Sequence, residues 1–342
     1  MAARISSVAR LAVVVVVASS ALAFGLANRG DVSDAAKAIG TASPVFMIVG
    51  LVLAAVSLLN LAGFHAASQR AAGVEVHARE LVGPVAAAGF LNVVVKSGAM
   101  AGLAPMLRHA RLRGRSRGAT LAGYVLVNLL GHLAFACLLV GTIAVLVVEG
   151  RFARVDALAV LTFFVLSTGQ LALVLAATRS RDAVRRLHSL PRRTLRRLRL
   201  GDPTDEHPES TESADELFGA VTLLRANLRS AGPAFGHALL VEFIGIAQLY
   251  CVLRAIGEHP ALSVPVLAYA IAVLFTIVGI LPGGLGTVEA GLGALLVSRG
   301  IPGSQAVAAV VLFRLLELWL PLLGGLVASR VVFHMEICEA ET

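Results

Sequence analysis

The sequence predicts an all-α polytopic membrane protein with about seven to eight apolar segments. Hydrophobic residues make up 57% of the 342 residues and charged residues only 15%, against about 25% charged in an ordinary soluble domain. Mean hydropathy is +0.84, and the apolar runs approach the ~20 residues that one membrane span requires. We therefore expect a single integral membrane domain over residues 1–342. The net charge of +8 is attributed to arginine-rich cytoplasmic loops.

The first two spans are predicted near the N-terminus. Leu11–Ala27 is continuously apolar after a short basic start. A cleavable signal peptide would look similar, and Ala21-Leu22-Ala23 is compatible with a cleavage site, so both readings stay open. The second span is predicted over Pro44–Ala62, after a loop of mixed charge.

The third apolar stretch, Leu81–Leu107, is irregular. It contains Asn92, Lys96-Ser97-Gly98 and Pro105. Lys96 is one of two lysines in the chain, and a lysine at the centre of a bilayer is costly unless it faces a polar surface. Two readings remain: a lysine near a helix end with its ammonium group among the headgroups, or a broken segment with Lys96 facing a polar cavity.

Loop charge supports the second reading. The loop after this stretch carries five arginines and no acidic residue, from Arg108 to Arg117, so we expect it in the cytoplasm. The basic N-terminus and the loop holding Arg70 and Arg79 are expected there too. One crossing cannot separate two cytoplasmic loops, so we predict that residues 81–107 form a broken or re-entrant element.

The remaining chain predicts further spans and one large loop. The spans are Ala119–Val148, Ala157–Thr178, Pro233–Leu253, Leu262–Leu281 and Ser304–Ser329. Residues 179–230 form a cytoplasmic loop with nine arginines up to Arg199, followed by seven acidic residues between Gly201 and Glu216. The arginines lack interleaved aromatic residues, so we expect contact with anionic lipid headgroups and not with nucleic acid.

The stretch richest in helix-breaking residues is the second predicted broken or re-entrant element, residues 281–303. Pro282 removes a backbone donor, and Gly283, Gly284 and Gly286 permit φ > 0, so an ordinary helix cannot continue there. Broken backbone at membrane depth is expected only where it lines a cavity or the protein interior. A second break follows at Gly300-Ile301-Pro302-Gly303.

Three ionisable residues accompany this element. Glu289 follows the glycines, and Arg314 and Glu317 lie three apart on one face of the last span. They could form a self-neutralising pair within one helix. Alternatively, Glu289 competes for Arg314 and leaves a net charge facing a cavity. Glu242, with Gln248, is a further polar feature of the span 233–253, and its position leaves both an interfacial and an internal placement open.

These residues resemble the C-terminal signature of a membrane-protein family. The stretch Leu281–Ala290, followed by Gly300, Ala306, Arg314, Trp319-Leu320-Pro321 and Gly324, is similar to the lysylphosphatidylglycerol synthase transmembrane region, the flippase-like integral membrane proteins. Asn92, Ser97-Gly98 and Leu107-Arg108 resemble the first-half motif of that family, although Lys96-Ser97 stands where many members have a proline before the glycine.

The resemblance implies a multi-pass protein of the inner or plasma membrane that moves aminoacylated phosphatidylglycerol or polyisoprenoid-linked lipids between leaflets. The chain ends at Thr342, twelve residues after Arg330, so we expect the membrane region without the soluble synthase domain.

Three function classes therefore remain. The first is a translocator of an anionic phospholipid or polyisoprenoid-linked lipid. The second is a non-transporting scaffold for a lipid- or glycan-modifying membrane enzyme. The third, an intramembrane transferase with Glu289 as a base, lacks a nucleophile partner in the sequence, so we expect no enzyme. No cofactor is expected, because no phosphate-binding loop, metal-ligand spacing or paired cysteines are present. The predicted substrate-binding residues are Lys96, Ser97, Gly98, Pro282, Gly283, Gly284, Gly286, Glu289, Arg314 and Glu317.

Overall fold

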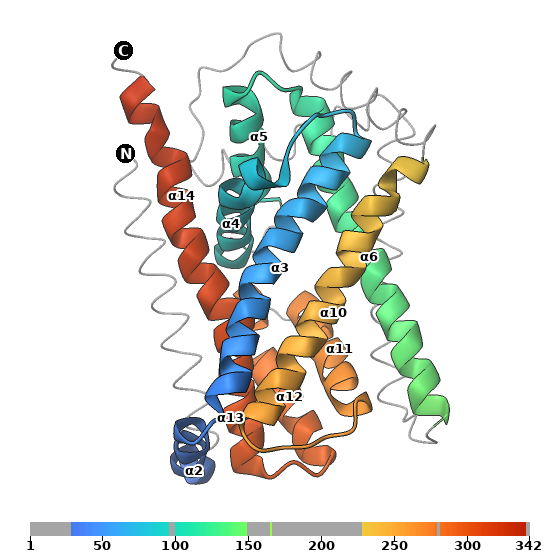
Figure 1. The fold of residues 1–342 in the computed structure, drawn as a ribbon, viewed down its shortest axis with the longest axis vertical. Coiled ribbons are helices and arrows are strands. Elements are labelled where there is room, and N and C mark those ends of the chain that lie inside the picture. The colour runs from blue at the N-terminus through green and yellow to red at the C-terminus, as the bar shows by residue number, and fades with distance from the viewer. Residues whose placement is uncertain (1–28, 96–99, 149–164, 166–227, 279–280, 340–342) are drawn as a thin grey trace.

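The computed structural model describes residues 29–95, 100–148, 165, 228–278 and 281–339 (Figure 1). Within these ranges the chain forms helices and no strand. Four of the described helices are long and apolar enough to cross a membrane: Pro44–Ala71, Arg117–Ala144, Arg229–Ala255 and Gly303–Val332. A shorter apolar helix covers Ser263–Ile277. The all-α membrane class is thereby confirmed, while the count of seven to eight segments stays a prediction. The predicted segment 11–27, the segment 157–178 apart from residue 165, and nearly all of the loop 179–230 lie outside the described residues.

The chain before the second span differs from the prediction. The expected loop contains a helix, α2 (Arg29–Gly40), which packs against α13 (Gly303–Arg314) near one end of the molecule (Figure 1). Ala35 of α2 is 3% exposed and belongs to the main hydrophobic core. The charged residues of α2 hid this contact in the sequence, because Asp34 and Lys37 pair with each other on the exposed side.

The second span is longer than expected. Helix α3 runs from Pro44 to Ala71, nine residues beyond the predicted end at Ala62. Its last turns contain polar residues, including Ser68 and Gln69, but these are buried. Helix α6 (Arg117–Val148) packs closely on these turns, and Gly123 permits the contact, since a Cβ there would lie 2.8 Å from the Cα of Gln69. Burial of these polar residues against α6 thus allows α3 to continue beyond the end that hydropathy predicts.

The third apolar stretch is interrupted, as predicted. Helix α4 (Ala78–Val94) ends before residues 96–99, and α5 (Leu103–Leu112) begins after them. The two short helices contact each other, and α6 (Arg117–Val148) follows as a long span (Figure 1). The re-entrant path of this stretch across a bilayer stays a prediction.

Helix α10 (Gly232–Ala255), preceded by the short turn η1 (Leu228–Ala231), lies along α3. A reciprocal polar pair joins these two helices within their apolar surfaces. The Asn60 amide donates to the His237 carbonyl oxygen at 3.0 Å, and Asn60 Oδ1 lies 2.6 Å from His237 Nδ1. Such pairing satisfies polar groups that would be costly to bury alone. Helix α11 (Ser263–Val278) follows and contacts both α10 and α12.

The C-terminal part is built from short pieces and one long helix. A 3₁₀ turn, η2 (Pro282–Gly284), precedes α12 (Thr287–Ser298). Helix α13 (Gly303–Arg314) continues through a π-helical turn, η3 (Leu315–Trp319), into α14 (Leu320–Glu339). The break before Gly303 is therefore confirmed, and the predicted last span is continuous apart from the π-helical turn.

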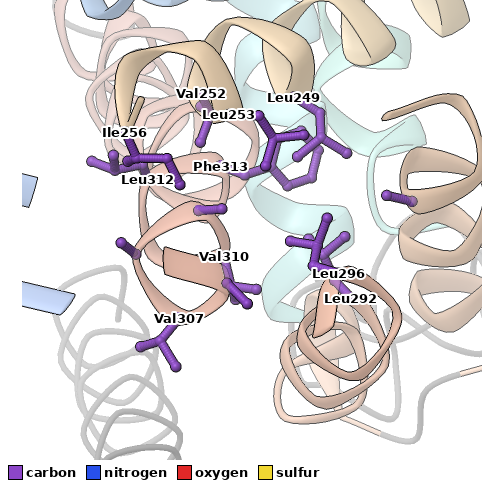
Figure 2. Packing of buried hydrophobic residues seen from close by; sticks show 14 of the residues in the cluster. Leu249, Val252, Leu253, Ile256, Leu292, Leu296, Val307, Val310, Leu312 and Phe313 are labelled. Atoms are coloured by element: carbon purple, nitrogen blue, oxygen red, sulfur yellow. The ribbon is translucent and has the colours of Figure 1, made fainter. Parts of the chain in front are cut away.

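The main hydrophobic core joins α10, α12 and α13 (Figure 2). Phe313, beside Arg314 in sequence, is fully buried in it. The core also fixes the end of α13 against α10, which sets where Arg314 can lie. The labelled side chains are Leu249, Val252, Leu253, Ile256, Leu292, Leu296, Val307, Val310, Leu312 and Phe313.

Candidate functional site

Arg314 is the centre of the polar group at the C-terminal break. Its side chain is 3% exposed and donates three hydrogen bonds. Nε donates to Glu289 Oε1 at 2.8 Å, and Nη1 donates to Glu317 Oε2 at 3.0 Å. Nη2 donates to the backbone oxygen of Gly283 at 2.8 Å. Arg314 therefore joins the predicted glycine-rich turn to α12 and to the last span, and both of its predicted carboxylate partners bind it at once.

The turn that Arg314 binds requires glycine. Gly283, Gly284 and Gly286 have φ values of 64°, 67° and 81°, a region that side chains with a Cβ rarely adopt. At Gly284 a Cβ would also lie 2.9 Å from the Cα of Thr276, so α11 packs directly on the turn. Thr287 stabilises the turn further, because its hydroxyl donates to the Gly284 oxygen at 2.9 Å.

Glu289 has a second hydrogen-bond partner, which holds its carboxylate in place. Its Oε2 accepts a hydrogen bond from the Gly286 N–H at 2.6 Å, at the start of α12. A carboxylate in the first turn of a helix satisfies a free N–H group and is favoured by the helix dipole. Both oxygens of Glu289 are thus bound, one by a cation and one by a helix N-terminus.

The three ionisable residues carry a formal net charge of −1: two carboxylates and one guanidinium. Glu317 is the member open to its surroundings, with a side chain 35% exposed against 12% for Glu289 and 3% for Arg314. Arg314 is buried and binds three protein acceptors with three of its five N–H groups. The charge available to a ligand is therefore negative and is carried by Glu317.

The other break is held by Asn92, on the last turn of α4. Its Oδ1 accepts from the Gly102 N–H at 2.6 Å, and its Nδ2 donates to the Tyr124 hydroxyl at 3.1 Å. A Cβ at Gly102 would lie 2.5 Å from the Asn92 amide nitrogen, so glycine permits this contact. Asn92 thereby brings the start of α5 back to the end of α4. The predicted site residues Lys96, Ser97 and Gly98 lie outside the described residues.

The end of α4, which leads into the first break, meets the turn of the second break. Helix α4 contacts the turn η2. A Cβ placed on Gly283 would lie 3.5 Å from Val93 of α4 and 3.1 Å from Leu318 of the π-helical turn. Val93 is three residues before Lys96. The chain that leads into the first break therefore contacts the turn of the second.

Glu242 is buried inside the protein. Its span covers Arg229–Ala255, and Glu242 is thirteen residues from either end and 8% exposed. Tyr269 of α11, which the sequence analysis did not single out, lies beside its carboxyl group. Gly245, one turn after Glu242, makes room for the Tyr269 ring, because a Cβ there would overlap it. In the sequence, Gly245 one turn after Glu242 was the signal that a large side chain could approach this acid.

The helices and the two adjoining breaks define a multi-pass helical membrane protein with interrupted elements. The chain belongs to the family described as the lysylphosphatidylglycerol synthase TM region, which it matches over residues 8–325. It is also similar to a UPF0104 membrane protein of Methanothermobacter thermautotrophicus, with 28% identity over 146 residues. That similarity covers 42% of this chain and 42% of the archaeal protein, less than half the length of either.

Proposed function

We propose that the chain moves an anionic phospholipid or a polyisoprenoid-linked lipid between the leaflets of the cell membrane. The observation that carries this proposal is the meeting of two helix breaks beside a buried charged group. Arg314 is eleven residues from Gly303 and eighteen from Val332 in its span, about 17 and 27 Å at 1.5 Å per residue. It therefore lies far from both ends. Interrupted helices with polar groups at this depth are how transporters build substrate sites.

Within this proposal the residues divide into two roles. Arg314 and Glu289 hold the glycine-rich turn, because Arg314 binds the Gly283 oxygen and both Glu289 oxygens are bound, one by Arg314 and one by the Gly286 N–H. Glu317 contributes the accessible negative charge, so it suits a hydroxyl or an amino group of the headgroup. The phosphate needs a cation other than Arg314, and we assign that role to Lys96.

Lys96 can be tested against a matched control. Lys37 is the only other lysine of the chain; its side chain is 75% exposed and pairs with Asp34 on the exposed side of α2. Purified protein is reconstituted in vesicles with fluorescent phosphatidylglycerol, and exchange between leaflets is followed by quenching of the outer leaflet. We expect Lys96→Ala to lose at least ten-fold in rate and Lys37→Ala to match the wild type.

Two outcomes would contradict the proposal. Equal rates for Lys96→Ala and the wild type would remove Lys96 from the site. Wild-type protein that moves neither phosphatidylglycerol nor a polyisoprenyl phosphate faster than empty vesicles would favour the scaffold alternative, in which the arginine-rich loop positions a membrane enzyme. The proposed activity makes and breaks no covalent bond, so no catalytic residue is assigned.

A further inference from the structure

Glu242 is a buried acid at the centre of a membrane span. Thirteen residues separate it from Arg229 and from Ala255, about 20 Å along the helix in each direction. Its exposed fraction is 8%. An ionisable residue at this depth is costly and is commonly part of an ion or proton pathway.

The Glu242 carboxyl group has no cation to pair with among the described residues around it. Its Oε2 has no hydrogen-bond partner there, and the polar group beside it is the neutral Tyr269 hydroxyl. This contrasts with Glu289, whose two oxygens are bound by Arg314 and by the Gly286 N–H. Burial of an unpaired carboxylate is unfavourable, whereas the protonated acid carries no charge and can itself donate.

The helices packed against α10 support this assignment. Apart from Arg314, their described ionisable residues lie toward helix ends or are histidine, tyrosine or cysteine. Helix α3 contributes His65 and Arg70, and α6 contributes Arg117, Tyr124, His132 and Cys137. Helix α11 contributes Tyr269, α13 contributes Arg314 and η1 contributes Arg229, while α10 itself also holds His237, Tyr250, Cys251 and Arg254. Arg314 already binds Glu289, Glu317 and the Gly283 oxygen.

We propose that Glu242 is a proton-binding site inside the membrane domain, and that it couples proton binding to the headgroup site. A proton from water adds to a carboxylate oxygen of Glu242 and leaves from the same oxygen; no other bond changes. Tyr269 provides the link, because its ring packs against Gly245, one turn after Glu242, and shares a core with Phe313 and Leu316, the residues just before Arg314 and Glu317. Neutralising Glu242 therefore changes the field at the accessible carboxylate of the site. The coupling part of this inference rests on the proposed lipid transfer, while proton binding itself does not.

Infrared spectroscopy of the full chain in lipid nanodiscs tests the proton site directly. A protonated carboxylic acid gives a carbonyl stretching band that a carboxylate lacks. We expect this band in the wild type at neutral pH and its loss in Glu242→Gln, a substitution of nearly equal shape. Glu317→Gln, which removes a more exposed carboxylate, is the matched control and should keep the band. Tyr269→Phe should keep the band at a shifted frequency, because the neighbouring hydroxyl is gone.

The outcomes separate this inference from the proposed function. A band absent from the wild type, unchanged in Glu242→Gln, or unshifted in Tyr269→Phe would overturn the proton site. If the band belongs to Glu242 but vesicles show no lipid transfer, the proton site stands and the proposed function fails. If lipid is transferred, coupling predicts that a pH gradient across the vesicle changes the wild-type rate at least three-fold and leaves the rate of Glu242→Gln unaffected. An equal response of both would overturn the coupling.

Discussion

Arg314 Nε lies 2.8 Å from Glu289 Oε1, although 25 residues separate them in the chain. The contact closes the segment that contains α12, since Glu289 lies in the first turn of that helix and Arg314 ends α13. Arg314 also binds the Gly283 oxygen, so one side chain fixes the turn before α12 and the helix after it.

Arg314→Ala should lower the free energy of unfolding by about 3–5 kcal/mol, because it leaves the buried Glu289 without its cation. The control is Glu317→Gln, at a side chain that is 35% exposed, where we expect less than about 1 kcal/mol. Both are measured by denaturation in detergent. Equal effects of the two changes would show that Arg314 does not hold the turn.

Gly325→Ala should destabilise the packing of α14 on α4. A Cβ at Gly325 would overlap the Ala86 oxygen and lie 2.8 Å from Phe90 Cβ, whereas Gly324 faces open space. Gly324→Ala is therefore the matched control, and it should be neutral or stabilising by about 0.5–1 kcal/mol, since alanine favours helix. Melting temperatures of the two variants in detergent measure the difference. A Gly325→Ala protein as stable as Gly324→Ala would contradict this interface.

The ion pair between Glu80 and Arg115 should make stability fall at low pH. Arg115 Nη2 donates to Glu80 Oε2 at 2.8 Å, and this hydrogen bond is the main cause that lowers the pKa of Glu80 from 4.5 to about 2. Because the folded pKa is below the unfolded one, the stabilisation is present above pH 4.5 and is lost as pH falls toward 2. We expect the melting temperature of the wild type to drop more than that of Glu80→Gln across this window. An equal fall in the melting temperature of both proteins would show that the Glu80–Arg115 ion pair does not contribute.

Asn60→Ala should cost about 1–3 kcal/mol, because His237 then loses the side chain that both accepts from it and donates to its carbonyl oxygen. Asn128→Ala is the comparison: Asn128 donates to the Tyr124 oxygen of its own helix, so its loss removes no contact between helices. Chemical denaturation of both variants measures the cost. A larger effect at Asn128 would show that the α3–α10 pair is not the stronger of the two.

A single cysteine at Arg111 should react only with reagents supplied from the cytoplasmic side. Arg111 is exposed at the end of α5, so accessibility does not limit the reaction. Cys137, Cys251 and Cys338 are replaced first. Labelling from outside would overturn the predicted re-entrant path of residues 81–107.

Hydropathy predicted the described spans, since long apolar runs form helices in a membrane whichever partners they meet. The break before Gly303 and the glycine-rich turn followed from backbone chemistry alone. The sequence also placed Glu289, Arg314 and Glu317 in one group, although it did not show that Arg314 binds both carboxylates.

Contacts between distant helices escaped prediction. The Asn60–His237 pair, Tyr269 beside Glu242, and α2 on α13 each depend on which helix faces meet. Spans that are apolar all round do not reveal those faces. The extension of α3 to Ala71 was not predicted for the same reason, because its polar last turns are buried by α6.

The π-helical turn at Leu315–Trp319 is equivalent to one extra residue inserted into an α-helix. One residue corresponds to a rotation of about 100°. The extra residue therefore lets a single continuous helix direct Arg314 toward the turn at Gly283 and, further along, direct Gly325 toward Ala86 of α4. Converting the π-helical turn to a regular α-helix would rotate α14 about its own axis and separate Gly325 from α4. The contacts of Arg314 and the packing of α14 on α4 therefore both depend on this turn.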